Sequence, residues 1–510
     1  MSDGRRRGGA RRAPKSSRIP RSSGSDGSPS RGGARALRPR GRRTRGLPGT
    51  LGMTVLGALV PGFGYLYAGR RAVGGIVLLV WLIALGGAAW YFREGIRSAL
   101  DLAFDPTRLK ILAAALIAGL VVWAFVVLTS YRLVRPTTRP RWHTAAGYVA
   151  VAVVCAAVAV PVVTAAQYAL ATAEAVDTVF QDSESATTPE GRTKENPWAG
   201  TDRVNVLLLG GDGGEGRTGV RTDTVILVSI GVDTGKTVMV SLPRNMMNAQ
   251  FPEDSPLYDL YPEGYTGYSE PAYYMLNAIY GQVPANHPGV LGESDNEGAD
   301  AVKQAVSGSL GVPVDYYVLV NLEGFKEIVD AMGGITVNIN EQVAIQGNTD
   351  AGIPPVDYLD PGPDQHLDGF EALWFARGRY GSDDYARMDR QRCTVDAIID
   401  AADPMTLFTK YRDLLKAGKD IVYTDIPIDL APAFVDLALK VKDAKTKSVV
   451  FKSSENFFSG DPDFDWMRET VEKAIYPPKR DPKRSKPDNP SEDAEDACAY
   501  QPEDDVVAGE

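Results

Sequence analysis

The stretch VNVLLLGGDGG, residues 204–214, decides the fold of this chain. A run dominated by valine and leucine that ends in a glycine-rich turn is typical of a buried strand followed by a tight loop. Two more apolar runs follow at residues 224–230 and 237–242. Further strand patterns lie at residues 316–320 and 335–339, and helical patterns lie at residues 273–280, 299–310, 322–332, 369–376 and 386–401. Strands that alternate with helices predict an α/β domain with a central mixed sheet between helices.

The chain has 510 residues and a formal net charge of -9, but the charge is distributed unevenly. Residues 1–46 are rich in arginine, glycine, serine and proline and contain almost no acidic side chain. This composition buries too little apolar surface to offset the ordering entropy, so we expect a disordered tail on the anionic, cytoplasmic face of a membrane. No aromatic residue interleaves the arginines to stack on bases, which argues against a nucleic acid partner.

An α-helical transmembrane region is predicted at residues 47–170. It contains three apolar runs that are long enough to cross a hydrocarbon core, which requires about 20 residues. We predict spans at residues 73–92, 109–131 and 146–170. A shorter apolar run at residues 51–67 contains Pro61-Gly62-Phe63-Gly64. We expect this run to be interfacial or re-entrant.

Arginines around the apolar runs predict the orientation by the positive-inside rule. Arg70-Arg71 and the connection from Arg132 to Arg141 are basic and belong on the cytoplasmic side, together with the tail. Three spans that start inside leave the rest of the chain outside, which predicts a multi-pass protein of the cell membrane with an extracytoplasmic domain. The rest divides into a linker at residues 171–200, a folded domain at 201–475 and a mostly disordered acidic tail at 476–510.

Polar side chains gather where the first strands of the predicted sheet meet their turns. Asp212 lies in the glycine-rich turn, Arg221 and Asp223 enter the second strand, and Arg244 follows the third. The ends of adjacent strands converge in an α/β sheet, so we expect these side chains to meet in one crevice. Taken singly, Asp212 is also a residue type that serves turns.

A second cluster is rich in arginine and surrounds the start of the helix predicted at residues 386–401. Its members are Arg377, Arg379, Asp384, Arg387, Arg390 and Gln391. Charges three residues apart are ordinary on a solvated, salt-bridged helix. The density of arginines here instead favours phosphate recognition, because the planar guanidinium binds phosphate oxygens bidentately and stays charged.

The two clusters are chemically complementary. Asp212 and Asp223 with a bound Mg²⁺ (or Mn²⁺) can hold a diphosphate, while arginines neutralise the charge that develops in phosphoryl transfer. Histidine-based chemistry is disfavoured, because the histidines are few and scattered: His143, His287 and His366. The cysteines follow no zinc-binding or CxxC pattern.

From Arg203 to about Asp400 the chain resembles the LytR-CpsA-Psr family, enzymes that attach wall glycopolymers to peptidoglycan. The matching stretches are VNVLLLG with Asp212, RTDT at 221–224, SLPR at 241–244, VDAMGGI at 329–335, LDGFEAL at 367–373 and the arginine-rich cluster. The family usually continues Pro-Arg with Asp, whereas this chain has Asn245. The resemblance therefore does not imply any role at position 245 that requires a negative charge.

The resemblance implies an LCP-type catalytic domain with an apolar slot for a prenyl chain. The donor would be a polyprenyl diphosphate-linked glycan, the acceptor a hydroxyl of peptidoglycan, and the product a phosphodiester. Implied catalytic residues are Arg244, Arg377, Arg379, Asp384 and Arg387; implied substrate ligands are Arg221, Arg390 and Gln391; implied metal ligands are Asp212 and Asp223. Asp384 would be either the base for the acceptor hydroxyl or an orienter of Arg379 and Arg387.

Two other functions use the same residues. A polyprenyl diphosphate phosphohydrolase would take water as the acceptor and release free glycan. A non-catalytic regulator would bind envelope lipid and act through partners, and would tolerate neutral residues in place of Arg377 and Arg379.

Cys393 and Cys498 are the cysteines that the predicted topology places outside the membrane. An extracytoplasmic compartment permits disulfides. A lone cysteine in an acidic tail has no packing reason to be there, so we hypothesise a bond that pins the C-terminus near the arginine cluster. The alternative is a small buried free cysteine at 393 and an exposed thiol at 498.

Overall fold

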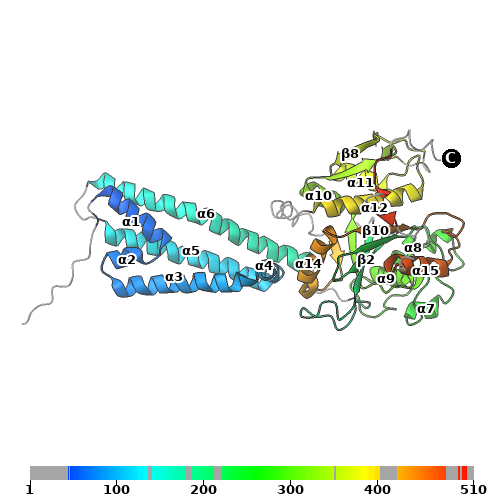
Figure 1. Ribbon diagram of the computed structural model, residues 1–510, viewed down its shortest axis with the longest axis horizontal. Coiled ribbons are helices and arrows are strands. Elements are labelled where there is room, and N and C mark those ends of the chain that lie inside the picture. Colours follow the sequence, from blue (N-terminus) through cyan, green and yellow to red (C-terminus); the bar gives the residue numbers. More distant parts are fainter. Residues whose placement is uncertain are drawn as a thin grey trace, which may run out of the picture.

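The computed structural model describes residues 44, 46–135, 140–179, 185–211, 221–347, 349, 352–402, 422–477, 492–493 and 497–501. A bundle of helices forms one end of the molecule and an α/β domain forms the other (Figure 1). The expected disordered tail at residues 1–46 falls almost entirely outside the described residues.

The bundle begins with short helices and continues with long apolar ones. Its elements are α1 (Leu47–Leu59), α2 (Phe63–Tyr67), α3 (Arg71–Tyr91), the 3-10 turn η1 (Phe92–Glu94), α4 (Ile96–Ala103), α5 (Pro106–Val134) and α6 (Arg141–Val179). Within the described residues, three helices are long and apolar enough to cross a membrane: α3, α5 and α6. They coincide with the three predicted spans, and each begins a few residues earlier than predicted.

Helix α6 differs from the sequence-based expectation, which ends the last span at residue 170 and begins a linker there. The helix has 39 residues and is therefore about 58 Å long at 1.5 Å per residue, roughly twice the hydrocarbon core of a bilayer. It continues through Val179, and residues 171–179 contain no Gly or Pro to end it. An apolar run therefore locates a span but not the end of its helix.

The described residues 185–200 of the expected linker are anchored to the domain. Ser185 Oγ and Thr187 Oγ1 donate to Asp300 Oδ1 at 2.7 and 2.6 Å. Arg192 forms an ion pair with Asp315 at 2.6 Å, and both side chains are buried. These contacts hold residues 185–192 against the domain.

The domain is built on a mixed sheet, as predicted. Within the described residues the sheet has seven strands in the order β11-β10-β3-β2-β1-β4-β9. Antiparallel pairs join β1 to β2 and β2 to β3, while β1 runs parallel to β4 and β3 parallel to β10. The strands are β1 (Arg203–Gly211), β2 (Thr222–Gly231), β3 (Thr237–Ser241), β4 (Tyr316–Asn321), β9 (Val422–Thr424), β10 (Thr446–Val450) and β11 (Glu492–Asp493).

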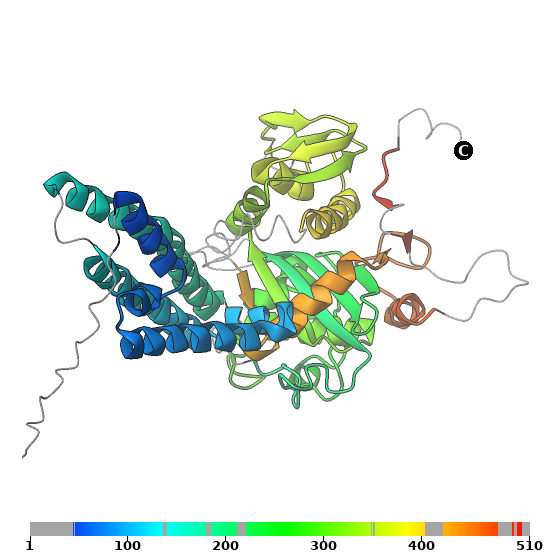
Figure 2. The same ribbon diagram turned by 60° about the vertical axis from the view of Figure 1, so that its left-hand side comes forward.

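Helices cover both faces of the sheet, which explains why its central strands are apolar on both sides. Alternate residues such as Leu207 and Leu227 face a core formed with α8, α9 and α15. The other face, with Ile226 and Met239, turns toward α12 and α14. Figure 2 shows α14 running across the sheet. These elements are α7 (Pro256–Leu260), η2 (Pro271–Tyr273), α8 (Leu276–Asn286), α9 (Glu297–Leu310), α12 (Asp384–Ala401), η3 (Ile428–Leu430), α14 (Ala431–Lys442) and α15 (Phe464–Ile475).

A smaller lobe with its own apolar core lies above the sheet (Figure 2). It pairs β5 with β8 and β6 with β7, both antiparallel. Its elements are α10 (Leu322–Met332), β5 (Ile335–Ile339), β6 (Val343–Ile345), β7 (Asp357–Leu359), β8 (Gly362–Leu367) and α11 (Gly369–Arg377). Helix α12 joins lobe and sheet, because Ala397 packs in the lobe core and Val395 packs toward the sheet.

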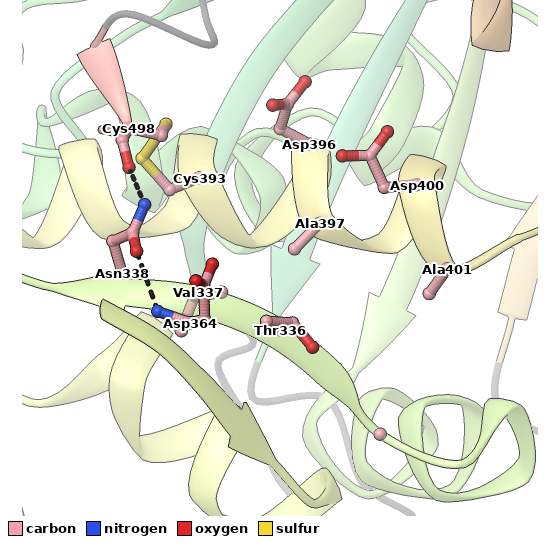
Figure 3. Close-up of a pocket in the computed structure, with 11 residues that line it drawn as sticks. Thr336, Val337, Asn338, Asp364, Cys393, Asp396, Ala397, Asp400, Ala401 and Cys498 are labelled. Carbon is pink, nitrogen blue, oxygen red and sulfur yellow. Dashed lines mark hydrogen bonds between the residues drawn. A yellow bond between two sulfur atoms is a disulfide. The ribbon is translucent and has the colours of Figure 1, made fainter. Parts of the chain in front are cut away.

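The C-terminal segment is tied to this lobe by the disulfide that the sequence predicts. Cys393 on α12 bonds Cys498, and their Cα atoms are 5.6 Å apart. Asn338 Nδ2 of β5 donates to the carbonyl oxygen of Cys498 at 2.9 Å (Figure 3). Residues 492–493 also pair with β10. The expected disordered tail is therefore ordered at these positions.

Candidate active site

An apolar slot of about 630 Å³ lies between the sheet and helices α10, α12 and α14. Its sheet wall includes Leu208 and Val228, and its helix wall includes Val395 and Leu437. Asp223, Arg377, Arg387 and Gln391 also line the slot, and Arg387 is hydrogen-bonded to Asp223; we call the part of the slot at Asp223 and Arg387 its mouth. The slot therefore combines an apolar body with a charged mouth, as the resemblance implies.

Strand pairing and helix capping bring the two predicted clusters to this mouth. Asp223 is the second residue of β2, and Arg244 follows β3, the neighbouring strand. Asp383 caps α12 by accepting a hydrogen bond from the amide of Ala386 at 2.7 Å. This cap makes Asp384 the first helical residue, one turn before Arg387.

Carboxylates and guanidiniums alternate in an ion-pair network at the mouth. Arg244 Nη1 lies 2.6 Å from Asp223 Oδ1, and Arg244 Nε lies 3.3 Å from Asp384 Oδ1. Arg387 Nη2 lies 3.0 Å from Asp384 Oδ2 and donates to the carbonyl oxygen of Asp223 at 3.3 Å. Asp384 thus holds one arginine with each carboxylate oxygen.

Burial gives the two arginines of this network different properties. Arg387 is only 2% exposed, and burial lowers its pKa to about 10 although the Asp384 carboxylate opposes the shift. Burial also acts against the charge on Arg244, but Asp223 and Asp384 together raise its pKa. Both guanidiniums are therefore charged at neutral pH. Within the described residues, Arg387 Nε is buried and has no hydrogen-bond partner.

The remaining arginines of the predicted site differ in position. Arg377 ends α11 with its guanidinium 5.7 Å from the centre of the Trp374 ring and lines the slot. Arg379 is exposed two residues later, and Arg221 is exposed just before β2. Arg390, an expected substrate ligand, instead donates to backbone carbonyls of Phe375 and Gly378.

Of the two predicted metal ligands, the structure describes one. Asp223 lies at the mouth, whereas Asp212 falls in residues 212–220, outside the described part of the chain. In the described part, no group of three or more histidine, cysteine or acidic residues is arranged to hold a metal ion. One or two carboxylates suffice for Mg²⁺ when substrate phosphates supply further oxygens. The donor chemistry of Asp223 and Asp212 fits that requirement.

The LytR_cpsA_psr family model matches residues 164–461 of the chain. The chain belongs to this family. The polyisoprenyl-teichoic acid–peptidoglycan teichoic acid transferase TagU of Bacillus subtilis (strain 168) is 29% identical over 258 residues, which cover 50% of this chain and 71% of TagU. TagU of Oceanobacillus iheyensis is 30% identical over 259 residues, covering 50% of this chain and 69% of that protein. The crystal structure of B. subtilis TagV aligns with a TM-score of 0.37 at 24% identity, covering 53% of this chain and 96% of TagV.

Membership of the family was readable from motifs, but part of the site was not. The slot wall formed by Phe434, Leu437 and Val441 comes from α14, a helix that is not among those predicted from the sequence. The amphipathic pattern APAFVDLALKVK at residues 431–442 was the available signal. Asn245 follows Arg244 and is half-buried.

Helix α12 has a cavity on each side. The second cavity, of about 430 Å³, is lined by Asp396, Asp400 and Asp364 and lies beside the disulfide (Figure 3). Its polar lining makes it unlike the slot. One face of α12 therefore lines the apolar slot, and another face lines the acidic cavity.

Proposed function

We propose that this protein transfers a glycopolymer phosphate from a polyprenyl diphosphate carrier to a hydroxyl of peptidoglycan. The observation that carries the proposal is the apolar slot that ends in the Asp223–Arg244–Asp384–Arg387 network. A polyprenyl diphosphate has the same two parts, an apolar chain and a charged head. The activity for which the TagU relatives are named agrees with this match.

The slot supplies the binding energy for the chain, and the arginines supply charge at the head. Burial of a prenyl chain stabilises the complex by about 0.8 kcal/mol per buried CH₂. Arg377 and Arg387 line the same space as the apolar walls. We assign Arg244, Arg377, Arg379 and Arg387 to neutralising the phosphate oxygens as negative charge moves during transfer.

The reaction forms one phosphorus–oxygen bond and breaks another. The acceptor hydroxyl oxygen bonds the glycan-linked phosphorus, and the bond from that phosphorus to the bridging oxygen of the diphosphate breaks. Polyprenyl phosphate leaves with the bridging oxygen, and the hydroxyl proton passes to this leaving phosphate. Both oxygens of Asp384 are engaged by arginines, so we assign Asp384 as an orienter of Arg244 and Arg387 rather than as the base.

Mg²⁺ (or Mn²⁺) is proposed as a cofactor, with Asp223 and Asp212 as the residues that would hold it. A bound divalent ion would neutralise part of the diphosphate charge. Asp223 also pairs with Arg244 at 2.6 Å, which ties this carboxylate to the arginine network.

We also propose a multi-pass topology in the cell membrane, with a cytoplasmic N-terminus and an extracytoplasmic catalytic domain. Three apolar helices suit such an anchor. The hairpin of α1 and α2 fits a re-entrant segment, because Trp123 Nε1 of α5 donates to the carbonyl oxygen of Ala58 at 3.0 Å. Thr44, which precedes this hairpin, is hydrogen-bonded through its Oγ1 to the carbonyl oxygen of Val134 on α5. Trp123 lies about 16 Å along α5 from Val134. The hairpin therefore reaches about half of the way through a hydrocarbon core.

Reconstitution of the full-length protein with a lipid-linked glycan, Mg²⁺ and peptidoglycan fragments tests the proposal. We expect glycan bound to peptidoglycan and release of polyprenyl phosphate. Free glycan phosphate without a peptidoglycan product would instead mark a phosphohydrolase. Complementation of a deletion strain by Arg377→Gln/Arg379→Gln would mark a non-catalytic regulator.

A further inference from the structure

The side chain of Arg390 lies inside the arginine cluster but contacts the protein backbone. Its Nε donates to the carbonyl oxygen of Phe375 at 2.8 Å, and its Nη2 donates to the carbonyl oxygen of Gly378. We infer that Arg390 is a positioning residue that holds the turn carrying Arg377 and Arg379. The inference rests on the proposed function and gives that site a device that sets its geometry.

The end of α11 explains why an arginine is needed there. The helix ends at Arg377, and the amide of Gly378 closes the last turn on the carbonyl oxygen of Trp374 at 2.7 Å. The final carbonyls of a helix have no intrahelical partner, and a cation near them is favourable for the helix dipole. Arg390 meets both needs, since it supplies charged donors to the carbonyl of Phe375 and to the one just beyond the helix.

The turn is confined on its other side by the lobe. Gly378 is buried, and a Cβ atom at this position would lie 2.7 Å from the carbonyl oxygen of Ala344 in β6. The same atom would lie 2.9 Å from the carbonyl oxygen of Trp374. The backbone between Arg377 and Arg379 thus lies between β6 and Arg390. Its position determines the positions of the Cα and Cβ atoms of both arginines.

The position of Arg390 also distinguishes it from two of the arginines assigned to phosphate. Arg377 and Arg387 line the slot, whereas Arg390 is not among the lining residues of the described chain. Two of its donors are directed to carbonyls, and burial lowers its pKa. Its planar fork spans two acceptors, which the single ammonium of lysine cannot do in the same geometry.

Arg390→Lys and Arg390→Ala test the assignment in the full-length protein. A displacement of about 1 Å in catalytic groups costs up to about 10²-fold in rate. We therefore expect kcat to fall about 10- to 100-fold in both variants, with the KM for the lipid-linked donor within about threefold of wild type, because the slot still binds the chain. Hydrogen–deuterium exchange of the peptide covering residues 376–381 should rise, without a matching rise in the sheet.

Arg392→Lys is the matched control on the same helix. Arg392 is buried and its Nη1 donates to Ser448 Oγ of β10 at 2.8 Å. This variant should keep kcat within about threefold and leave exchange at residues 376–381 unchanged.

Two outcomes would overturn the inference. One is a raised KM with unchanged kcat and unchanged exchange in Arg390→Lys, which would make Arg390 a substrate ligand. The other is Arg390→Lys with wild-type kcat. If Arg390→Ala shows raised exchange throughout the domain, Arg390→Lys alone decides between a positioning role and a ligand role. Absence of transfer by the wild-type protein would refute the proposed function. The exchange measurement would still test whether Arg390 holds the turn between Arg377 and Arg379.

Discussion

Replacing Val395 with Trp should stop the slot from holding a full prenyl chain. Val395 is half-buried on α12, lines the slot and packs toward Ile226 and Met239 of the sheet. An indole at this position takes the space of roughly one isoprene unit. Five carbons at about 0.8 kcal/mol per buried CH₂ contribute about 4 kcal/mol, so loss of one unit should weaken binding by about 10³-fold. Partial rerouting of the chain would reduce the loss, and we expect a factor of about 10² to 10³.

The assay is equilibrium binding of polyprenyl diphosphates of defined chain length to the full-length protein in nanodiscs. A two-unit analogue should lose less affinity than a long one, because it fills less of the slot. Ala401→Trp is the matched control, since Ala401 lies on the same helix but lines the acidic cavity on its other side. Equal affinity of wild type and Val395→Trp for the long chain, with both proteins folded, would refute the lipid slot.

Further predictions concern charge, metal and the disulfide. Arg377→Ala and Arg379→Ala should each lower the transfer rate by about 10³-fold, on the order of the cost of losing one preorganised donor, with the thermal midpoint nearly unchanged; near-normal transfer would contradict the assignment. Chelation should abolish transfer and Mg²⁺ should restore it, and Asp223→Ala should lower both the rate of transfer and its dependence on Mg²⁺. Transfer that is insensitive to chelator would mean that the arginines bind the phosphates without a metal ion. Cys498→Ser opens a loop with a sequence separation of 105 residues, so it should lower the free energy of unfolding by up to about 4 to 5 kcal/mol, measured by denaturation without reductant; an unchanged midpoint would show that the bond constrains little.

The parts of the fold that could be predicted were those with long, unambiguous patterns. The strands at residues 204–209 and 224–230 are apolar on both faces because helices cover both, and such runs are visible in sequence. Strand β10 (Thr446–Val450) is short and partly polar, and it becomes a strand because it pairs in parallel with β3. That pairing is a tertiary interaction that no local pattern records.

The candidate site divides in the same way. Position at strand ends predicts that Asp223 and Arg244 share a crevice, and the arginine-rich pattern groups Asp384 with Arg387. Complementary chemistry and the family resemblance join the two clusters, and the four residues form one network. The sequence does not predict the partners of Arg390, since these are backbone carbonyls exposed only by the way α11 ends. An arginine in a sequence is as consistent with binding phosphate as with capping the carbonyls at a helix end, so residue type alone does not distinguish the two roles.

Tracing the two phosphates of the donor tests the central claim most directly. A lipid-linked glycan labelled with ³²P at the glycan-linked phosphate and ³³P at the prenyl-linked phosphate is incubated with the reconstituted protein, Mg²⁺ and peptidoglycan fragments. Transfer as proposed places ³²P on peptidoglycan and leaves ³³P on polyprenyl phosphate, and the variant Arg377→Ala/Arg379→Ala shows neither product. Recovery of ³²P only in water-soluble glycan, or of both labels together on one product, would contradict the account.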